Sequence, residues 1–167
     1  MDNRIKQITV PFLVMMIVNL GTYFIFGNNF AQGLSPHEGL VPIMGLLFGP
    51  YGAIGVVIGN TICDLIRGYT PQMTFASEII SLGVALLAYK LWYHDFKYKK
   101  NISQPKLNNT FNVILFLGIV LLTSVSYSMF HKKIMYFFYP ETISINLLIG
   151  LRFFINFLNS SFIFGII

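Results

Sequence analysis

The stretch "LLFGPYGAIGVVIGNTICDLIRG", residues 46–68, decides the fold class of this chain. It is apolar enough for a membrane segment, yet it contains five glycines, an Asn, an Asp and an Arg. The Pro and glycines of "GPYG", residues 49–52, break helical structure. We therefore predict two helices joined there by a tight Gly-Pro hairpin, at least one arm of which spans only part of the bilayer.

The composition of the whole chain points the same way. Of its 167 residues, 55% are hydrophobic and only 10% are charged, whereas soluble domains have about 25% charged residues. The composition therefore indicates an integral membrane protein. Its net charge of +5 is explained by membrane topology, so we expect no nucleic-acid partner. A single cysteine provides no disulfide framework and no Cys-based metal site.

The hydrophobic runs predict an all-α fold, an integral membrane bundle of six transmembrane helices. A full crossing needs about 20 apolar residues. We assign residues 1–167 to a single transmembrane domain. The chain stops in "FIFGII", in the middle of a helix by periodicity, so an N-terminal part of a longer chain is the alternative. The predicted helices lie near residues 8–27, 37–49, 50–68, 72–93, 110–130 and 144–167.

Basic residues predict the orientation, because positive charges are retained on the cytoplasmic side. Arg4 and Lys6 precede the first helix, and four lysines lie between the fourth and fifth helices. An even number of crossings separates these groups, so both fall on one side. Arg67, Lys132 and Lys133 oppose this orientation, but the count favours it. We expect a multi-pass plasma-membrane protein with a cytoplasmic N terminus.

The predicted helix 50–68 has two distinct faces. Gly52, Gly55 and Gly59 recur at three or four residues, and small faces let helix backbones approach closely in lipid. We predict that these three glycines pack against another helix. A second stripe carries polar side chains at i, i+4 and i+7: Asn60, Asp64 and Arg67.

Two further helices carry polar stripes. Glu78 is the only acidic residue of the predicted helix 72–93 and lies about 9 Å below its outer end at 1.5 Å per residue. Arg152, Asn156 and Asn159 share one face of the last helix, with Arg152 about 12 Å below its outer end. An ionised side chain facing lipid costs at least about 2.5–3.5 kcal/mol. These polar faces should therefore meet in the outer half of the bundle as a ligand-binding cavity.

The outer connections at residues 28–39 and 131–144 would cap such a cavity. From them we include three further candidate ligand-binding residues, His37, Glu38 and Tyr139. Tyr139 ends an aromatic cluster that also fits an interfacial belt. Because the remaining histidines are predicted to lie in other connections, we expect no metal site.

A structural interpretation of the same polar residues stays open. Asp64 and Arg67 lie one turn apart and fit a local ion pair, while Glu78 and Arg152 fit a buried structural pair. The asparagines of the last helix also fit interhelical hydrogen bonding. No Gly-rich phosphate loop, nucleophile elbow or HExxH motif is present. We therefore expect neither an enzyme nor a bound cofactor.

The stretch "EGLVPIMGLLFGPYGAIGVVIGNTICDLIRGYTP", residues 38–71, resembles the central hairpin of the substrate-binding S components of energy-coupling factor (ECF) transporters. These proteins are six-helix membrane domains of about this size. The resemblance implies capture of a vitamin-like micronutrient from outside, in an outer-half pocket formed by the fourth to sixth helices. It also implies ATPase and transmembrane coupling subunits as partners, in addition to the small-molecule ligand and membrane lipid.

The same hairpin also resembles membrane sensor domains that lie N-terminal to signalling enzymes such as histidine kinases, cyclases or phosphatases. In that alternative the last helix would continue into a fused cytoplasmic output domain. A third alternative is a structural or assembly protein, in which the polar residues serve only packing. The solute itself is not identified by the sequence.

Overall fold

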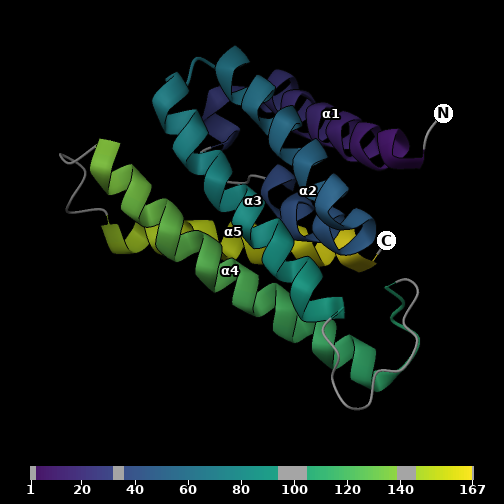
Figure 1. Cartoon of the computed structure of the whole chain (residues 1–167). Helices are drawn as coiled ribbons and strands as arrows, with labels where there is room; N and C mark the ends of the chain where they lie inside the picture. The colour runs from purple at the N-terminus through teal and green to yellow at the C-terminus, as the bar shows by residue number, and fades with distance from the viewer. Residues whose placement is uncertain (1–2, 32–35, 94–104, 139–145, 167) are drawn as a thin grey trace.

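A computed structural model describes residues 3–31, 36–93, 105–138 and 146–166 of the chain. The described residues form an all-helical protein with no strand. Five α-helices and one short 3-10 helix follow one another along the chain (Figure 1). They are α1 (Asn3–Ala31), η1 (Pro36–Gly39), α2 (Leu40–Ile66), α3 (Pro71–Tyr93), α4 (Thr110–Phe138) and α5 (Asn146–Ile166).

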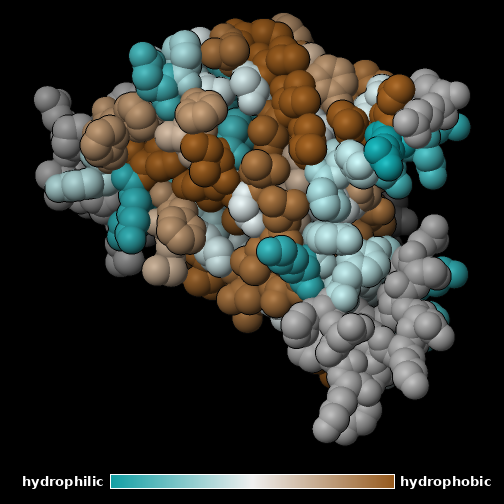
Figure 2. Space-filling view, in the orientation of Figure 1, coloured by the Kyte–Doolittle hydropathy of each residue, from teal (hydrophilic) through white to brown (hydrophobic). Residues whose placement is uncertain are grey.

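Four segments of the described chain are long and apolar enough to cross a membrane. Figure 2 shows apolar residues over most of the middle of the visible face, with hydrophilic residues mainly toward its left and right margins. This distribution is compatible with a multi-pass membrane protein. The predicted count of six spans is not confirmed by the described residues. The four segments are Asn3–Ile25, Pro36–Ile66, Pro71–Tyr93 and Thr110–Phe138.

The helices run back and forth between two ends of the molecule. In Figure 1 both termini lie at the right, whereas the turn from α2 to α3 and the C-terminal end of α4 lie at the left. Helix α2 packs against α1 on one side and α3 on the other, and α4 packs against α3 and α5. The short helix η1 packs mainly against α5.

Helix α2 covers both arms of the predicted hairpin and bends between them. Its backbone leaves helical geometry at Gly49, with φ 62° and ψ −146°. A Cβ on Gly52 would overlap the carbonyl oxygen of Met44, although residues eight apart on a straight helix are separated by about 12 Å. The chain therefore turns sharply at Gly49. Pro50 follows at a position where its missing N–H is not needed. The label α2 thus covers two helical arms that meet at a sharp turn at Gly49, as the Gly-Pro break predicts, and the first three residues of the predicted segment 37–49 belong to η1.

Two helices, α1 and α4, are longer than predicted and longer than one bilayer crossing requires. Helix α1 extends from Asn3 to Ala31. Helix α4 continues to Phe138, through a region predicted to be an outer connection. Lys133 lies in this extension with Nζ 6.0 Å from the centre of the Phe130 ring. A long lysine side chain packs its stem on apolar surface and extends its charge to the interface, so the helix does not need to end before it.

Close helix approaches occur at the glycines of α2. A Cβ on Gly55 would overlap the carbonyl oxygen of Ile8, and one on Gly59 would lie 2.9 Å from the carbonyl oxygen of Phe12. Gly55 and Gly59 therefore lie directly against the backbone of α1. Gly52, predicted to share this packing face, instead lies against the first arm of α2 at the bend.

Candidate functional site

A buried chain of hydrogen bonds joins the first three long helices. Asn60 of α2 donates from Nδ2 to Oε1 of Glu78 on α3 at 2.6 Å, and it accepts at Oδ1 from Nδ2 of Asn19 on α1 at 2.7 Å. Arg67 Nη1 donates to Asn19 Oδ1 at 3.1 Å. We call Asn19, Asn60, Arg67 and Glu78 the polar network. It places a carboxyl group and a guanidinium at two ends of one hydrogen-bonded chain.

The local sequence explains why the network forms at this point. Asn60 directly follows Gly59, whose lack of a side chain lets the backbones of α1 and α2 approach closely. Asn19 lies on the same buried side of α1 as Met15, one turn earlier. The close approach brings two short amide side chains within direct hydrogen-bonding distance. Longer side chains or water would be needed at an ordinary helix separation.

Asp64 and Arg67 lie at the end of α2 nearest the turn to α3. Asp64 is buried and interacts electrostatically with Arg67. The guanidinium nevertheless hydrogen-bonds to Asn19 and lies 5.8 Å from the ring centre of Tyr23 and 5.4 Å from that of Tyr69. The local Asp64–Arg67 ion pair is absent among the described contacts. Arg67 therefore links α1 to α2, and it does not act only as a counter-charge to Asp64 on its own helix.

A second polar group adjoins the network on α3. Ser77, the neighbour of Glu78 in sequence, has its hydroxyl oxygen 3.3 Å from Nε2 of His131 on α4. Tyr127 places its hydroxyl 3.4 Å from the same nitrogen and stacks on the imidazole ring at 4.2 Å between centroids. His37 in η1 interacts electrostatically with His131 and with Arg67. We call His37, Ser77, Tyr127 and His131 the histidine group.

Several buried polar atoms around these two groups lack a hydrogen-bond partner among the described residues. Leaving such an atom unsatisfied costs roughly 1–3 kcal/mol. A polar molecule that supplied the missing partners would therefore be bound favourably. The unpartnered atoms are Glu78 Oε2, Thr74 Oγ1, His37 Nδ1, His131 Nδ1 and Arg67 Nε.

The predicted site residues from the first outer connection and from α5 are only partly brought together. His37 and Glu38 are buried in η1, which packs against α5. Asn156 is buried on α5, and its carbonyl oxygen accepts from Ser160, beside which Gly39 of η1 packs.

Arg152 and Asn159, by contrast, occupy exposed positions of α5. Glu78 is buried whereas Arg152 is exposed, so the described residues give no support to the predicted buried pair of these two side chains. Arg152 lies about 9 Å from the start of α5, where a long arginine side chain can extend toward the interface. Tyr139 lies outside the described residues.

Sequence reasoning missed four members of the two groups. Asn19 is an amide inside the apolar run of α1, and polar residues within membrane segments generally face other helices; this signal was available. His131 was assigned to a connection because the predicted fifth helix ended too early. Tyr127 and Ser77 carried no signal, since single hydroxyl groups are common in membrane helices.

Within the described part of the chain, no three His, Cys, Asp or Glu side chains are grouped as metal ligands. No protein family, no curated protein and no solved structure matches this chain. The function must therefore be argued from the geometry of the polar network and the histidine group.

Proposed function

We propose that this chain is a membrane-embedded binding protein for a small polar solute, a vitamin-like micronutrient taken from outside, and that it acts as the specificity subunit of an ECF-type importer. The observation that carries the proposal is the state of Glu78. Its side chain is 4% exposed, one carboxyl oxygen is held by Asn60, and the other has no partner among the described residues.

A structural role alone accounts poorly for this arrangement. A carboxyl group inside an apolar bundle is expensive, and a purely structural one would have both oxygens satisfied. Here Asn60 orients the group by binding one oxygen and leaves the second for another donor. Thr74, one turn earlier on α3, adds a buried hydroxyl that is also unpartnered in the described chain. A solute with N–H or O–H groups would supply hydrogen-bond partners for the second carboxyl oxygen of Glu78 and for the hydroxyl of Thr74.

The helical arrangement supports the proposed architecture. Counting the two arms of α2 on either side of Gly49 separately gives six helical segments, as the S-component interpretation requires. Both termini lie at one end of the molecule (Figure 1), which agrees with an even number of crossings. With Arg4 and Lys6 near that end in sequence, the positive-inside rule places it in the cytoplasm. The polar network then lies nearer the outer face of the plasma membrane.

Release of the solute inward would require other subunits. The sequence contains no nucleotide-binding motif, so the energy would come from ATPase subunits acting through a transmembrane coupling subunit. The proposed role of this chain is selective capture without catalysis.

A membrane sensor domain is the second candidate, and the surface of α1 favours it. S components commonly dock on their coupling partner through small residues of the first helix. The exposed apolar residues of α1 are large instead: Ile5, Val10, Leu13, Ile17, Phe24 and Ile25.

Purification of the native chain from its host membranes in mild detergent tests the proposal. Mass spectrometry would identify both the proteins and the small molecules that accompany it. ATPase and coupling subunits support the importer. A chain that continues past Ile167 into a soluble signalling domain supports the sensor, and a chain without either partner or solute contradicts both.

A pair of variants ties the solute to Glu78. Glu78→Gln keeps an acceptor oxygen for Asn60 and replaces the second carboxyl oxygen with an amide, so the fold should persist while the bound solute is lost. Ser126→Ala is the matched control, because this exposed hydroxyl only bonds back to Leu122 O on its own helix. Equal solute content in both variants would show that Glu78 does not bind the solute.

A further inference from the structure

Thr74 and Glu78 lie one turn apart on α3, and each has a buried oxygen that is left unsatisfied. Residues four apart on a helix occupy the same face, with roughly 5–6 Å between their Cβ atoms. Thr74 is 2% exposed and Glu78 is 4% exposed. Neither Thr74 Oγ1 nor Glu78 Oε2 has a hydrogen-bond partner among the described residues. The two oxygens can therefore accept hydrogen bonds from one group placed between them.

The hydroxyl of Thr74 differs from those of three other helical threonines. Thr22, Thr61 and Thr123 each donate to the carbonyl oxygen four residues earlier, at 2.6–2.8 Å. This back-bonding is common for threonine inside a helix. Thr74 makes no such bond in the described part of the chain. Its hydroxyl is thus left for a partner from outside its own helix.

The hydrogen bonds of the polar network all run toward Glu78. Arg67 can only donate, so the Asn19 atom that it contacts must be the acceptor Oδ1. Asn19 then donates through Nδ2 to Asn60 Oδ1, and Asn60 donates through Nδ2 to Glu78 Oε1. The guanidinium at one end therefore fixes the orientation of both amides. This order favours negative charge on Glu78, where the chain of donors ends.

The polar network holds less positive charge than its carboxyl groups require. Asp64 and Glu78 are both less than a tenth exposed and interact electrostatically with each other. Arg67 interacts with Asp64, but it reaches Glu78 only through two asparagines. A buried charge is stable only when it is paired. Glu78 therefore favours a second cation.

Basic side chains of neighbouring elements are poorly placed to supply this cation. Lys132 of α4 packs toward α5, since its Cδ lies 3.3 Å from the Cβ position of Gly150. His37 interacts electrostatically with His131 and with Arg67, so a positive charge on His37 would be opposed by the guanidinium. The counter-charge for Glu78 would thus come from the solute.

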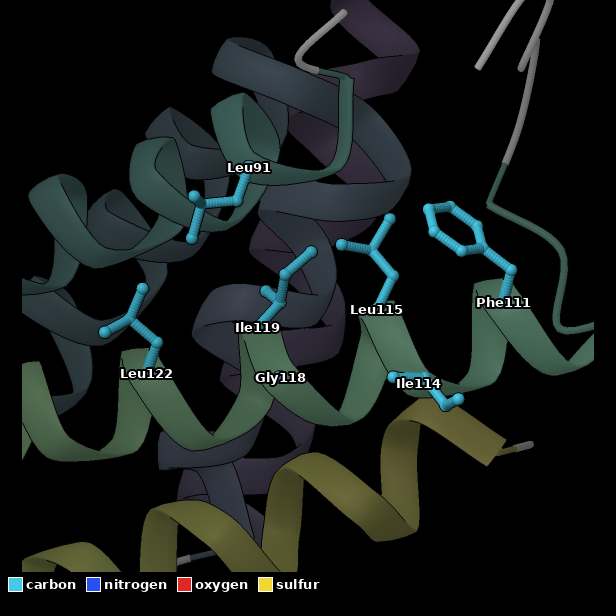
Figure 3. Close-up of a pocket in the computed structure, with 7 residues that line it drawn as sticks. All are labelled: Leu91, Phe111, Ile114, Leu115, Gly118, Ile119 and Leu122. Atoms are coloured by element: carbon cyan, nitrogen blue, oxygen red, sulfur yellow. The ribbon is translucent and has the colours of Figure 1, made fainter. Parts of the chain in front are cut away.

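An apolar hollow between α3 and α4 does not suit a charged solute. It has a volume of about 330 Å³ and is lined by Leu91 of α3 together with Gly118 and apolar side chains of α4 (Figure 3). The side chains that line it carry no nitrogen or oxygen. Leu91 also lies about 20 Å beyond Glu78 along α3, at 1.5 Å per residue. A charged group is therefore expected at Thr74 and Glu78.

We propose that the solute is recognised through a protonated amine, which donates one N–H to Glu78 Oε2 and another to Thr74 Oγ1. This inference rests on the proposed function and names the chemical class of its solute, an organic cation with at least two N–H groups. The ammonium supplies the counter-charge that Glu78 favours. Its N–H groups also satisfy both buried oxygens, which charge alone would not do.

Small ions that differ in charge and in N–H groups test this class directly. The purified full-length chain is titrated separately with methylammonium chloride, tetramethylammonium chloride, sodium chloride and sodium acetate, and thermal unfolding is followed in detergent. Methylammonium should raise the melting temperature by about 3–6 °C at ten times its dissociation constant. Tetramethylammonium has the same charge but no N–H, so its effect should not exceed that of sodium.

Three variants assign the contacts. Glu78→Gln should abolish the methylammonium shift, because the amide carries no charge. Thr74→Val keeps the shape of the side chain and removes only the hydroxyl, so it should weaken methylammonium binding at least about tenfold. Thr123→Val is the matched control and should leave the shift unchanged, because Thr123 is also buried but donates to Ile119 O on its own helix.

Equal shifts from methylammonium and tetramethylammonium would overturn the assigned N–H contacts. A shift from acetate alone, or none from methylammonium, would overturn the amine. An unchanged methylammonium shift in Thr74→Val or in Glu78→Gln would show that the amine does not bind at these two residues. Because the four salts are compared on the unaltered protein, the proposal is tested even if Glu78→Gln does not fold.

Failure of the amine is distinguishable from failure of the proposed function. If methylammonium has no effect but a solute still copurifies with the unaltered chain and is lost from Glu78→Gln, the chain binds a solute of another class. If no solute copurifies with the unaltered chain, the proposed function itself is contradicted.

Discussion

Asn60 on α2 and Glu78 on α3 are joined by a buried 2.6 Å hydrogen bond from Nδ2 to Oε1. Both side chains are less than a tenth exposed, and Asn60 uses its other amide atom to accept from Asn19 on α1. One asparagine therefore connects three helices. Because Asn60 directly follows Gly59, where α1 approaches closely, its side chain reaches both α1 and the carboxyl group on α3.

Replacing Glu78 by Ala should destabilise the protein by about 1–3 kcal/mol, because the buried Nδ2 of Asn60 loses its acceptor. Glu78→Gln should cost less, since a side-chain oxygen remains for Asn60. Thermal unfolding of the two variants in the same detergent measures the difference. Equal destabilisation by Ala and Gln would show that the hydrogen bond to Asn60 contributes little.

A double-mutant cycle on Asn19→Ala and Asn60→Ala should give a coupling free energy of about 0.6 kcal/mol, with an upper limit of about 1.7 kcal/mol, as measured for interhelical hydrogen bonds in membrane proteins. The free energies of unfolding of the single and double variants supply the cycle. Strictly additive effects would mean that the 2.7 Å contact does not contribute net stability. A pair of distant residues, Asn19 and Ser126, gives the additive reference.

Gly55→Ala should destabilise the packing of α1 on α2, because the new methyl group would overlap the backbone oxygen of Ile8, which cannot move without the whole helix. Gly21→Ala is the control within α1, since nothing lies within 4 Å of its Cβ position. That substitution should be neutral or stabilising by up to about 1 kcal/mol, as alanine is the better helix former. The melting temperature in detergent should therefore fall for Gly55→Ala and stay unchanged or rise for Gly21→Ala.

Gly49→Ala should destabilise the bend of α2 by about 1–3 kcal/mol, because φ 62° and ψ −146° is a conformation open essentially to glycine alone. The added Cβ would also lie 3.2 Å from the ring of Tyr89. Chemical or thermal unfolding compared with Gly83→Ala, an unhindered helical position, tests the effect. A stability equal to that of the control would mean that the bend relaxes to a conformation that alanine tolerates.

Cysteine labelling should report the orientation of the bundle. The native Cys63 is fully buried, so the unaltered protein should remain unlabelled by a membrane-impermeant maleimide. Tyr69→Cys, in the turn between α2 and α3, should be labelled in intact cells, and Lys106→Cys should be labelled only after the membrane is opened. The reverse pattern would invert the proposed topology and place the solute site on the cytoplasmic side.

The fold class follows from the sequence through local properties. Long apolar runs with few charges can satisfy their backbone hydrogen bonds only as helices in an apolar environment, so an all-helical protein with membrane-length helices was predictable. Gly49 and Pro50 marked the position of the break, because both act on the backbone itself. The length of α4 was not predictable, because a count of consecutive apolar residues does not show where lysine side chains extend their charges to the interface.

The site was only partly predictable, because it depends on contacts between helices and not on local properties of the chain. Asn60, Asp64 and Glu78 could be named because polar residues in apolar helices are conspicuous. Which of them meet depends on how the helices cross and bend, and that is set by many distributed contacts. The stripe on α5 illustrates this, since Asn156 is buried whereas Arg152 is exposed.

The sequence by itself therefore determined the helical, apolar character of the chain, the break in α2 and the polar residues available for a site. Only the tertiary structure decided that Asn19 and Asn60 touch, that Ser77 and Tyr127 lie beside His131, and that Glu78 is bound through one oxygen. The physical reason is range: backbone conformation and hydrophobicity act over a few residues, whereas a hydrogen bond across 41 or 54 positions exists only once the helices have packed.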